Sequence, residues 1–136
     1  MKLNLECIRS VMLSLERELS FTDDGDCLTK NDVSLERLCE LLPEYQKKDI
    51  FYSLFNLDQA GYLNISVHWA SDSVYECLVN YMTYDGHEFL NEIRDGKRWN
   101  KVKSITTAIR NYSLSAVSSI AEGVTNAAIS AFLSKE

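Results

Sequence analysis

The sequence predicts a mainly α-helical fold with a small β-hairpin. Apolar residues recur at helical spacing in several segments, the run 62–68 alternates with β-branched and aromatic residues, and a similar run at 77–82 leads directly into a helix-capping threonine, Thr83. With 136 residues, 46% of them hydrophobic, the chain is of single-domain size and can bury a core without disulfides or metal.

The first helix is predicted over residues 3–20, with Asn4 as its N-cap. Residues 22–32 have no hydrophobic period and are rich in aspartate, so we expect a solvated loop there. This loop lacks alternating oxygen ligands and a distal bidentate glutamate, and it therefore predicts no metal site. The apolar stripe of the first helix comprises Leu5, Ile8, Met12, Leu15 and Leu19.

Two further helices are expected before the hairpin. Ser34 caps a short helix that Pro43 ends, with Arg37 placed to pair with the surrounding glutamates. A longer helix begins at Gln46 and stops at Ala60–Gly61, where glycine suits a left-handed C-cap.

The segment after Gly61 predicts a hairpin followed by a helix. Its strands lie at 62–68 and 77–82, and a polar tip spans 69–76. Thr83 caps a helix over 84–94, with Asp95–Gly96 as the stop. A helix, a two-stranded ribbon and a capped helix follow one another in winged helix-turn-helix domains. We therefore expect a winged-helix-like domain over 1–94 and a helical C-terminal extension, for packing or dimerisation, over 95–136.

Composition narrows the classes of function. The net charge of −6 keeps the protein soluble but opposes attraction to nucleic acid or an anionic membrane, so DNA contact requires a local basic patch. The N-terminus does not resemble a signal peptide, and four widely spaced cysteines indicate reduced thiols, which together favour the cytoplasm. No nucleophile elbow, HExxH motif or glycine-rich phosphate loop is present, so we expect no catalytic residue, no cofactor and no small-molecule substrate.

The helix from Gln46 to Ala60 is the candidate DNA-reading element. Its face opposite Ile50, Leu54 and Leu57 carries donors suited to base edges and phosphates. The alternative is an ordinary solvated face, because residues 34–76 have a net charge of −4 where phosphate contacts would lie. The four candidate residues are Lys48, Tyr52, Asn56 and Gln59.

Positive charge concentrates instead between Arg94 and Arg110, where six cations oppose Asp95 alone. Of these, Arg98, Lys101 and Lys103 are candidates for the DNA backbone. They could equally meet the acidic half of a second subunit. A third interpretation is that the lysines are simply solvated around a buried stripe, which comprises Trp99, Val102, Ile105 and Ile109.

The chain from 113 to 133 predicts a helix with a single formal charge, Glu122. Its serine, threonine and alanine content argues against a lipid-spanning helix, so we expect no membrane association. A small residue at every fourth position allows close helix approach, either within the domain or in a homodimer, which we favour. The candidate interface residues are Leu114, Val117, Ile120, Val124, Ala128 and Phe132.

Three strings in the chain carry a resemblance to a known family: NLECIRSVMLSLE, DIFYSLFNLDQAGYL and YMTYDGHEFLNEIRDGKRWNKVK. They resemble a family of small phage-borne and prophage-associated bacterial proteins that is known only as a domain of unknown function. The GHEFLNEIRDGKRW string is the most specific part. The resemblance covers nearly the whole chain and implies a phage setting, but no activity or cofactor. More weakly, the frame LDQAGYL and YMTYDGHEFL looks like that of winged-helix transcriptional regulators.

These observations together predict a small phage-type regulatory protein that binds DNA as a winged-helix dimer. The alternative is an acidic protein-binding module, such as a phage-encoded inhibitor or adaptor of a host protein. Its acidic helix and wing would engage a basic partner.

Overall fold

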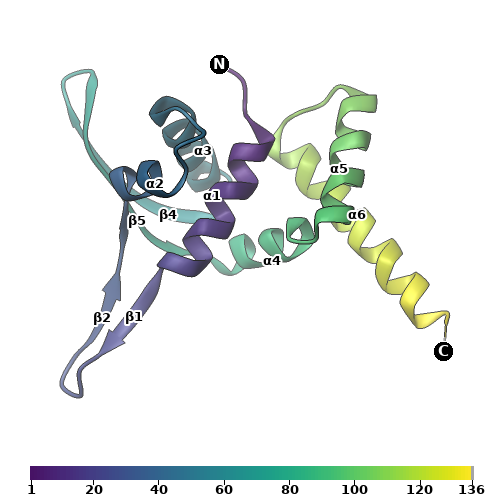
Figure 1. Ribbon diagram of the computed structural model, residues 1–136, viewed down its shortest axis with the longest axis horizontal. Helices are drawn as coiled ribbons and strands as arrows, with labels where there is room; N and C mark the ends of the chain where they lie inside the picture. Colours follow the sequence, from purple (N-terminus) through teal and green to yellow (C-terminus); the bar gives the residue numbers. More distant parts are fainter. Residues whose placement is uncertain (136) are drawn as a thin grey trace. The chain divides into compact units, whose positions relative to one another are not determined.

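The computed structural model describes residues 1–135 and divides into two compact units, Met1–Gly86 and His87–Glu136. The described chain is a mixed α/β protein with six helices and two small antiparallel sheets (Figure 1). The predicted mainly α fold with one hairpin therefore understates the β-structure. The units divide inside α4 (Tyr84–Ile93), before the boundary expected at residue 94.

The first unit begins with α1 (Leu5–Glu18), as predicted. The Asn4 side chain caps it by accepting a hydrogen bond from the Cys7 amide at 3.1 Å. Leu19 is the C-cap residue, one position beyond the helix. The face that α1 buries comprises Cys7, Ile8, Val11, Met12, Ser14 and Leu15.

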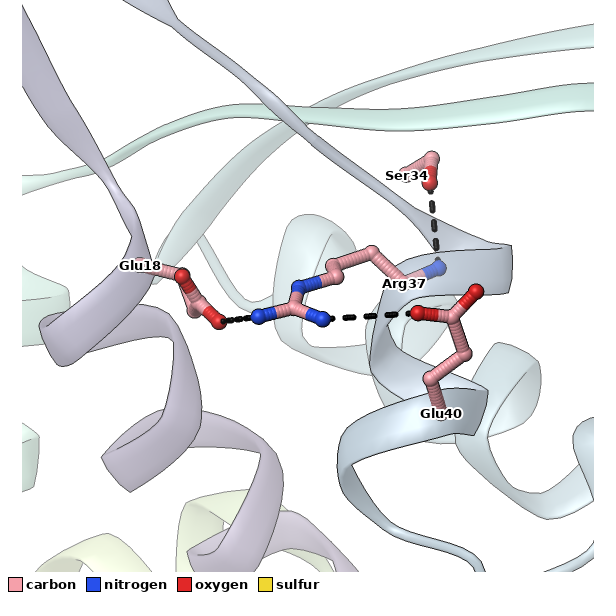
Figure 2. Close-up of polar contacts among 4 residues, drawn as sticks. All are labelled: Glu18, Ser34, Arg37 and Glu40. Carbon is pink, nitrogen blue, oxygen red and sulfur yellow. Dashed lines mark hydrogen bonds and ion pairs between the residues drawn. The ribbon is translucent and has the colours of Figure 1, made fainter.

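A polar cluster ties the end of α1 to α2 (Leu35–Leu41) (Figure 2). The Ser34 hydroxyl accepts a hydrogen bond from the Arg37 amide at 3.1 Å and so caps α2. The Arg37 guanidinium donates to Glu18 at 2.8 Å and to Glu40 at 3.3 Å. The predicted cap and the predicted arginine–glutamate pairing are both confirmed.

The helix α3 (Lys47–Gln59) buries Ile50, Leu54 and Leu57, which confirms the predicted inner stripe. It packs on α1, α2 and the neighbouring strand. The chain leaves α3 at Gly61 with φ of +86°, the left-handed conformation that glycine adopts without steric cost. This glycine turns the chain directly into the sheet.

The central sheet has three strands in the order β3 (Val33–Ser34), β5 (Ser73–Met82), β4 (Leu63–Ala70). Its buried residues are Val33, Leu63, Cys77, Val79 and Met82. Both long strands extend further than predicted and leave only 71–72 as the tip. The expected polar tip over 69–76 was wrong because the outer rungs pair without being buried, and so they show no apolar alternation. The two-residue strand β3 was not predicted either.

The predicted loop 22–32 is instead a hairpin formed by β1 (Ser20–Asp23) and β2 (Leu28–Asn31). The two strands pair over four rungs, and every residue in them is exposed. Without a buried face the strands carry no hydrophobic period, which is why the pattern suggested a loop. This ribbon and the β4–β5 tip both extend away from the helices of the first unit (Figure 1).

Thr83 joins the hairpin to the first turn of α4. Its hydroxyl accepts from the Gly86 amide at 3.0 Å, which confirms the predicted cap, and donates to the Gly61 carbonyl at 2.5 Å. Gly86 lies so close to the Tyr62 carbonyl that an added Cβ would stand 2.0 Å from that oxygen. We call the group Gly61, Tyr62, Thr83 and Gly86 the hairpin clasp.

The second unit contains the rest of α4, then α5 (Gly96–Ile109) and α6 (Leu114–Leu133), with a break between these two helices at 110–113. α4 ends at Ile93, next to the predicted stop at Asp95–Gly96, and Asp95 also caps α5, since its carboxylate accepts from the Arg98 amide at 2.9 Å. This hydrogen bond lowers the pKa of Asp95. α5 and α6 pack together, and the residues that they bury are Trp99, Val102, Thr106, Leu114, Val117, Ala121 and Val124.

Candidate binding surfaces

The four predicted DNA-reading residues share one face of α3 but differ in how available they are. Lys48 and Gln59 are exposed, whereas Tyr52 and Asn56 are half-buried. The Asn56 amide donates to the Tyr52 backbone carbonyl at 2.8 Å, inside the helix. Lys48 and Gln59 are therefore the two side chains of the set that extend fully into solvent.

An aromatic patch, not foreseen from the sequence, continues this surface toward the hairpin. Phe51 lies 6.1 Å from Phe55 between ring centroids, and 6.1 Å from Trp69 on β4 in an edge-to-face arrangement at 86°. Trp69 is 54% exposed. The i, i+4 spacing of the two phenylalanines was a visible signal, but the patch needed Trp69 in a strand rather than in the expected tip.

The surroundings of α3 are acidic. Met1–Gly86 contains seven lysines and arginines against fifteen aspartates and glutamates, a net charge of −8. Lys47, beside the candidate face, pairs with Glu36 at 3.5 Å. A phosphate backbone therefore meets net repulsion around this unit, whereas a basic protein surface meets attraction.

The predicted cationic residues of the second unit all lie on α5. Lys101 is exposed, whereas Arg98 and Lys103 are half-buried, and the Lys103 ammonium stands 5.9 Å from the centroid of the buried Trp99 ring. Of the buried stripe offered as the alternative, Trp99 and Val102 are buried, Ile105 is half-buried and Ile109 is 55% exposed. The outer side of α5 has a shallow hollow lined by Asn100, Lys103, Ser104 and Thr107.

The predicted dimer residues on α6 fall into two groups. Leu114, Val117 and Val124 are buried inside the chain and Ile120 is half-buried, whereas Ala128 and Phe132 are exposed. The last two turns of α6, residues 126–133, also expose Ile129 and Leu133 and carry no formal charge. We call this segment distal α6.

By length and composition, Leu114–Leu133 is apolar enough to cross a membrane, and it is the one such helix among residues 1–135. A mean hydropathy of 1.2 with 17% of the window buried also describes a helix that meets another protein surface. The two sets of cationic and polar candidates, on α3 and on α5, belong to different units.

The architecture defines a small mixed α/β protein with an acidic sheet-containing unit and a helical unit. The chain belongs to the family of hypothetical proteins DUF2513, whose model matches residues 2–112 and so ends before α6. It is also similar to an uncharacterized protein of Haemophilus influenzae, with 26% identity over 129 residues that cover 91% of this chain and 95% of the relative. No solved structure matches.

Proposed function

We propose that the first unit is a winged helix-turn-helix domain and that the protein is a small regulatory protein. The observation that carries this proposal is the strand order. The elements run α1, β3, α2, α3, β4, β5, and β3 pairs with β5, so the sheet order is β3-β5-β4. Winged-helix domains use this arrangement, with α2 and α3 as the helix-turn-helix and the β4–β5 hairpin as the wing. The β1–β2 ribbon is then an insertion ahead of β3.

The first candidate ligand is DNA, bound by a dimer. In this proposal α3 enters the major groove, where Lys48 and Gln59 contact bases or phosphates. Tyr52 and Asn56 lie between them, and Asn56 must exchange its intrahelical bond for a base contact. Arg98, Lys101 and Lys103 contribute contacts to the DNA backbone.

Fluorescence anisotropy with a random-sequence duplex tests this proposal. Between about 50 and 200 mM salt, each phosphate contact adds roughly 0.9 to the slope of log affinity against log salt. Lys48→Gln should lower that slope by about one contact, while Lys2→Gln, the same charge change on an exposed N-terminal residue, should not. Binding that is absent at low salt, or equally weakened by both variants, contradicts DNA reading by α3.

The second candidate ligand is a basic host protein, bound at the same surface. The net charge of −8 on this unit favours it, and so does the aromatic patch, because half-exposed aromatic residues are typical anchors of protein interfaces. A nuclease-treated host lysate supplies the test. Trp69→Ala should lose a stoichiometric partner that Tyr75→Ala retains, since Tyr75 is an exposed aromatic residue of the same hairpin outside the patch.

We further propose that distal α6 mediates homodimerisation in the cytoplasm, with a phage or prophage origin implied by the resemblance described above. Its exposed apolar residues and lack of charge support self-association over membrane insertion. Light scattering should give a dimer for the full chain and weaker self-association for Phe132→Ser. Flotation with liposomes that depends on Phe132 would favour the membrane instead.

A further inference from the structure

One face of the β1–β2 ribbon carries two exposed apolar side chains, Phe21 and Leu28. In the antiparallel register Phe21 pairs with Lys30, and Asp23 pairs with Leu28. Because cross-strand partners and alternate residues share a face, all four side chains lie on the same side. Phe21 is 68% exposed and Leu28 is 70% exposed, so this side has two large apolar groups in contact with water.

The opposite face satisfies its own hydrogen bonds. The Asn31 amide donates to the Ser20 hydroxyl at 2.9 Å and to the Thr22 hydroxyl at 2.7 Å. Thr29 completes this polar face. The other face is mixed: Phe21 and Leu28 are exposed to water, whereas Lys30 on the same face donates to Asn80 of β5 at 3.1 Å.

The loop at the tip of the ribbon carries three carboxylates, two of which are held in place by backbone amides. Asp23 accepts from the Gly25 amide, and Asp24 accepts from the amides of Asp26 and Cys27 at 2.9 and 2.7 Å. These backbone hydrogen bonds lower the pKa of Asp24. Asp26 uses its amide but not its carboxylate in the turn, and its charge faces solvent. The ligand of this ribbon must therefore combine apolar surface with positive charge.

The same chain carries a surface of complementary charge on α5. Between Gly96 and Ile109 the helix has four cations and no anion. Lys97 and Lys101 are exposed on the side that bears the shallow hollow lined by Asn100, Lys103, Ser104 and Thr107. From Lys97 to Ser104 the helix rises about 10 Å. The ribbon covers about the same length from Phe21 to its tip, at roughly 3.3 Å per residue.

We propose that the face of the β1–β2 ribbon that carries Phe21 and Leu28 docks on α5 of a second copy of this chain. Phe21 and Leu28 pack on the aliphatic stem of Lys103 and the methyl group of Thr107 in the hollow, and the acidic tip meets Lys97 and Lys101. Each copy supplies one ribbon and one α5, and in this proposal two copies exchange the contact reciprocally, as in an isologous dimer. The proposal is independent of the ligand of α3. Because Lys101 is also a candidate for DNA contact, the experiments below contain no nucleic acid.

A charge swap is the decisive experiment. Sedimentation equilibrium of the full-length protein should show a dimer, and Asp26→Lys or Lys101→Glu alone should weaken association at least tenfold. An equimolar mixture of the two variants should recover wild-type affinity, because the heterodimer pairs a basic tip with an acidic α5 and keeps one native contact. Failure of the mixture to associate more tightly than either variant overturns the proposal. Measuring association at different salt concentrations is less informative, because salt also screens the repulsion between two chains of charge −6.

A second experiment tests the apolar contact by comparing substitutions on the two faces of the ribbon. Phe21→Ser with Leu28→Ser should weaken association at least tenfold, whereas Thr29→Ser, on the polar face, should leave it unchanged. Circular dichroism should give both proteins the wild-type melting curve, since the substituted residues are exposed. Equal effects of the two variants contradict docking through the face that carries Phe21 and Leu28.

Association through distal α6 gives a different pattern. If Phe132→Ser abolishes the dimer while Asp26→Lys and Lys101→Glu leave it intact, then α6 alone joins the copies and the ribbon contact is refuted. A full-length protein that stays monomeric at all accessible concentrations refutes it as well.

Discussion

The two hairpins of the first unit share a motif but are held in different ways. The β4–β5 hairpin buries Leu63, Cys77 and Val79 under the helices, and the hairpin clasp fixes its ends. The β1–β2 ribbon buries none of its strand residues. The β4–β5 hairpin is therefore part of the hydrophobic core, whereas the β1–β2 ribbon projects from it.

The contacts that hold the β1–β2 ribbon lie where it joins the rest of the first unit. Arg37 joins Glu18, just before the ribbon, to α2, just after it (Figure 2). The Lys30 ammonium donates to the Asn80 side chain of β5 at 3.1 Å. Solvent screens exposed polar contacts of this kind, so they add little to the stability of the fold. Such contacts orient the ribbon but do not make it unfold together with the core. Substitutions in the hairpin clasp should therefore change the free energy of unfolding strongly, and substitutions in the ribbon only weakly.

The largest effect is expected from Gly86→Ala. A Cβ at this position would stand 2.0 Å from the Tyr62 carbonyl and 2.9 Å from Met82 Cγ, so backbone must move. We expect a loss of about 3 kcal/mol or more in the free energy of unfolding, measured with urea. The control is Gly123→Ala, where nothing lies within 4 Å and the helix should gain roughly 0.5–1 kcal/mol. Equal stability of the two variants would argue against the clasp.

The next largest contrast is in thiol reactivity, between Cys77 in the β4–β5 hairpin and Cys27 in the β1–β2 ribbon. Cys77 is buried, and burial raises its pKa from 9.0 to about 11, whereas Cys27 is exposed. At pH 8 this shift lowers the Cys77 thiolate population by about 100-fold. A thiol reagent followed by mass spectrometry should modify Cys27 at once and Cys77 only when the unit opens. Comparable rates would mean that β5 is not packed as described.

The same shift sets a pH dependence for the unit. The folded state favours the neutral Cys77 thiol more than the unfolded state does. Its contribution to stability is therefore complete below pH 9 and is lost as the pH rises from 9 to about 11. Replacing Cys77 by alanine should remove this alkaline loss, while Cys27→Ala should not.

Thr83→Ala should have an intermediate effect. It removes the cap on Gly86 and the hydrogen bond to the Gly61 carbonyl, at a cost of about 1–2 kcal/mol. Thr83→Ser keeps the hydroxyl and should stay within roughly 0.5 kcal/mol of wild type. If serine is as destabilising as alanine, the methyl group rather than the clasp is responsible.

The comparison also explains which elements could be predicted. Elements with a buried face could be predicted, because their apolar residues recur with the period of the helix or strand. This holds for the stripe of α1, the inner side of α3 and the inner rungs of β4 and β5. The ribbon 20–31 has no such face. Its usable signal was Asp24–Gly25, a dipeptide typical of hairpin turns, between two threonine-containing runs. The pairing of β3 with β5 depends on chain segments far apart and leaves no local trace in two residues.

Candidate surfaces were harder to predict than elements. Helical spacing correctly placed Lys48, Tyr52, Asn56 and Gln59 on one face, but it could not show that Asn56 bonds to the Tyr52 carbonyl. On α6 the spacing could not distinguish residues that pack within the chain from residues that remain exposed. Leu114 and Phe132 fit the same pattern, yet one is buried and the other is 66% exposed.

The smallest effect, and the sharpest comparison, concerns two asparagines that each donate two side-chain hydrogen bonds, and Asn80 also accepts one from Lys30. Asn80 donates to Asn64 and to Ser66, both at 2.9 Å, as Asn31 donates to Ser20 and Thr22 in the ribbon. Asn80 is half-buried on the central sheet, so Asn80→Ala should cost about 1 kcal/mol in global unfolding.

Asn31 is exposed, and Asn31→Ala should change global stability by less than about 0.5 kcal/mol. Its effect should appear instead as faster hydrogen exchange of ribbon amides, because local opening of the ribbon does not require the core to unfold. Equal global losses in the two variants would show that the ribbon unfolds together with the core. The distinction between the two hairpins would then be one of exposure only, and an uncovered ribbon would need no partner to be stable.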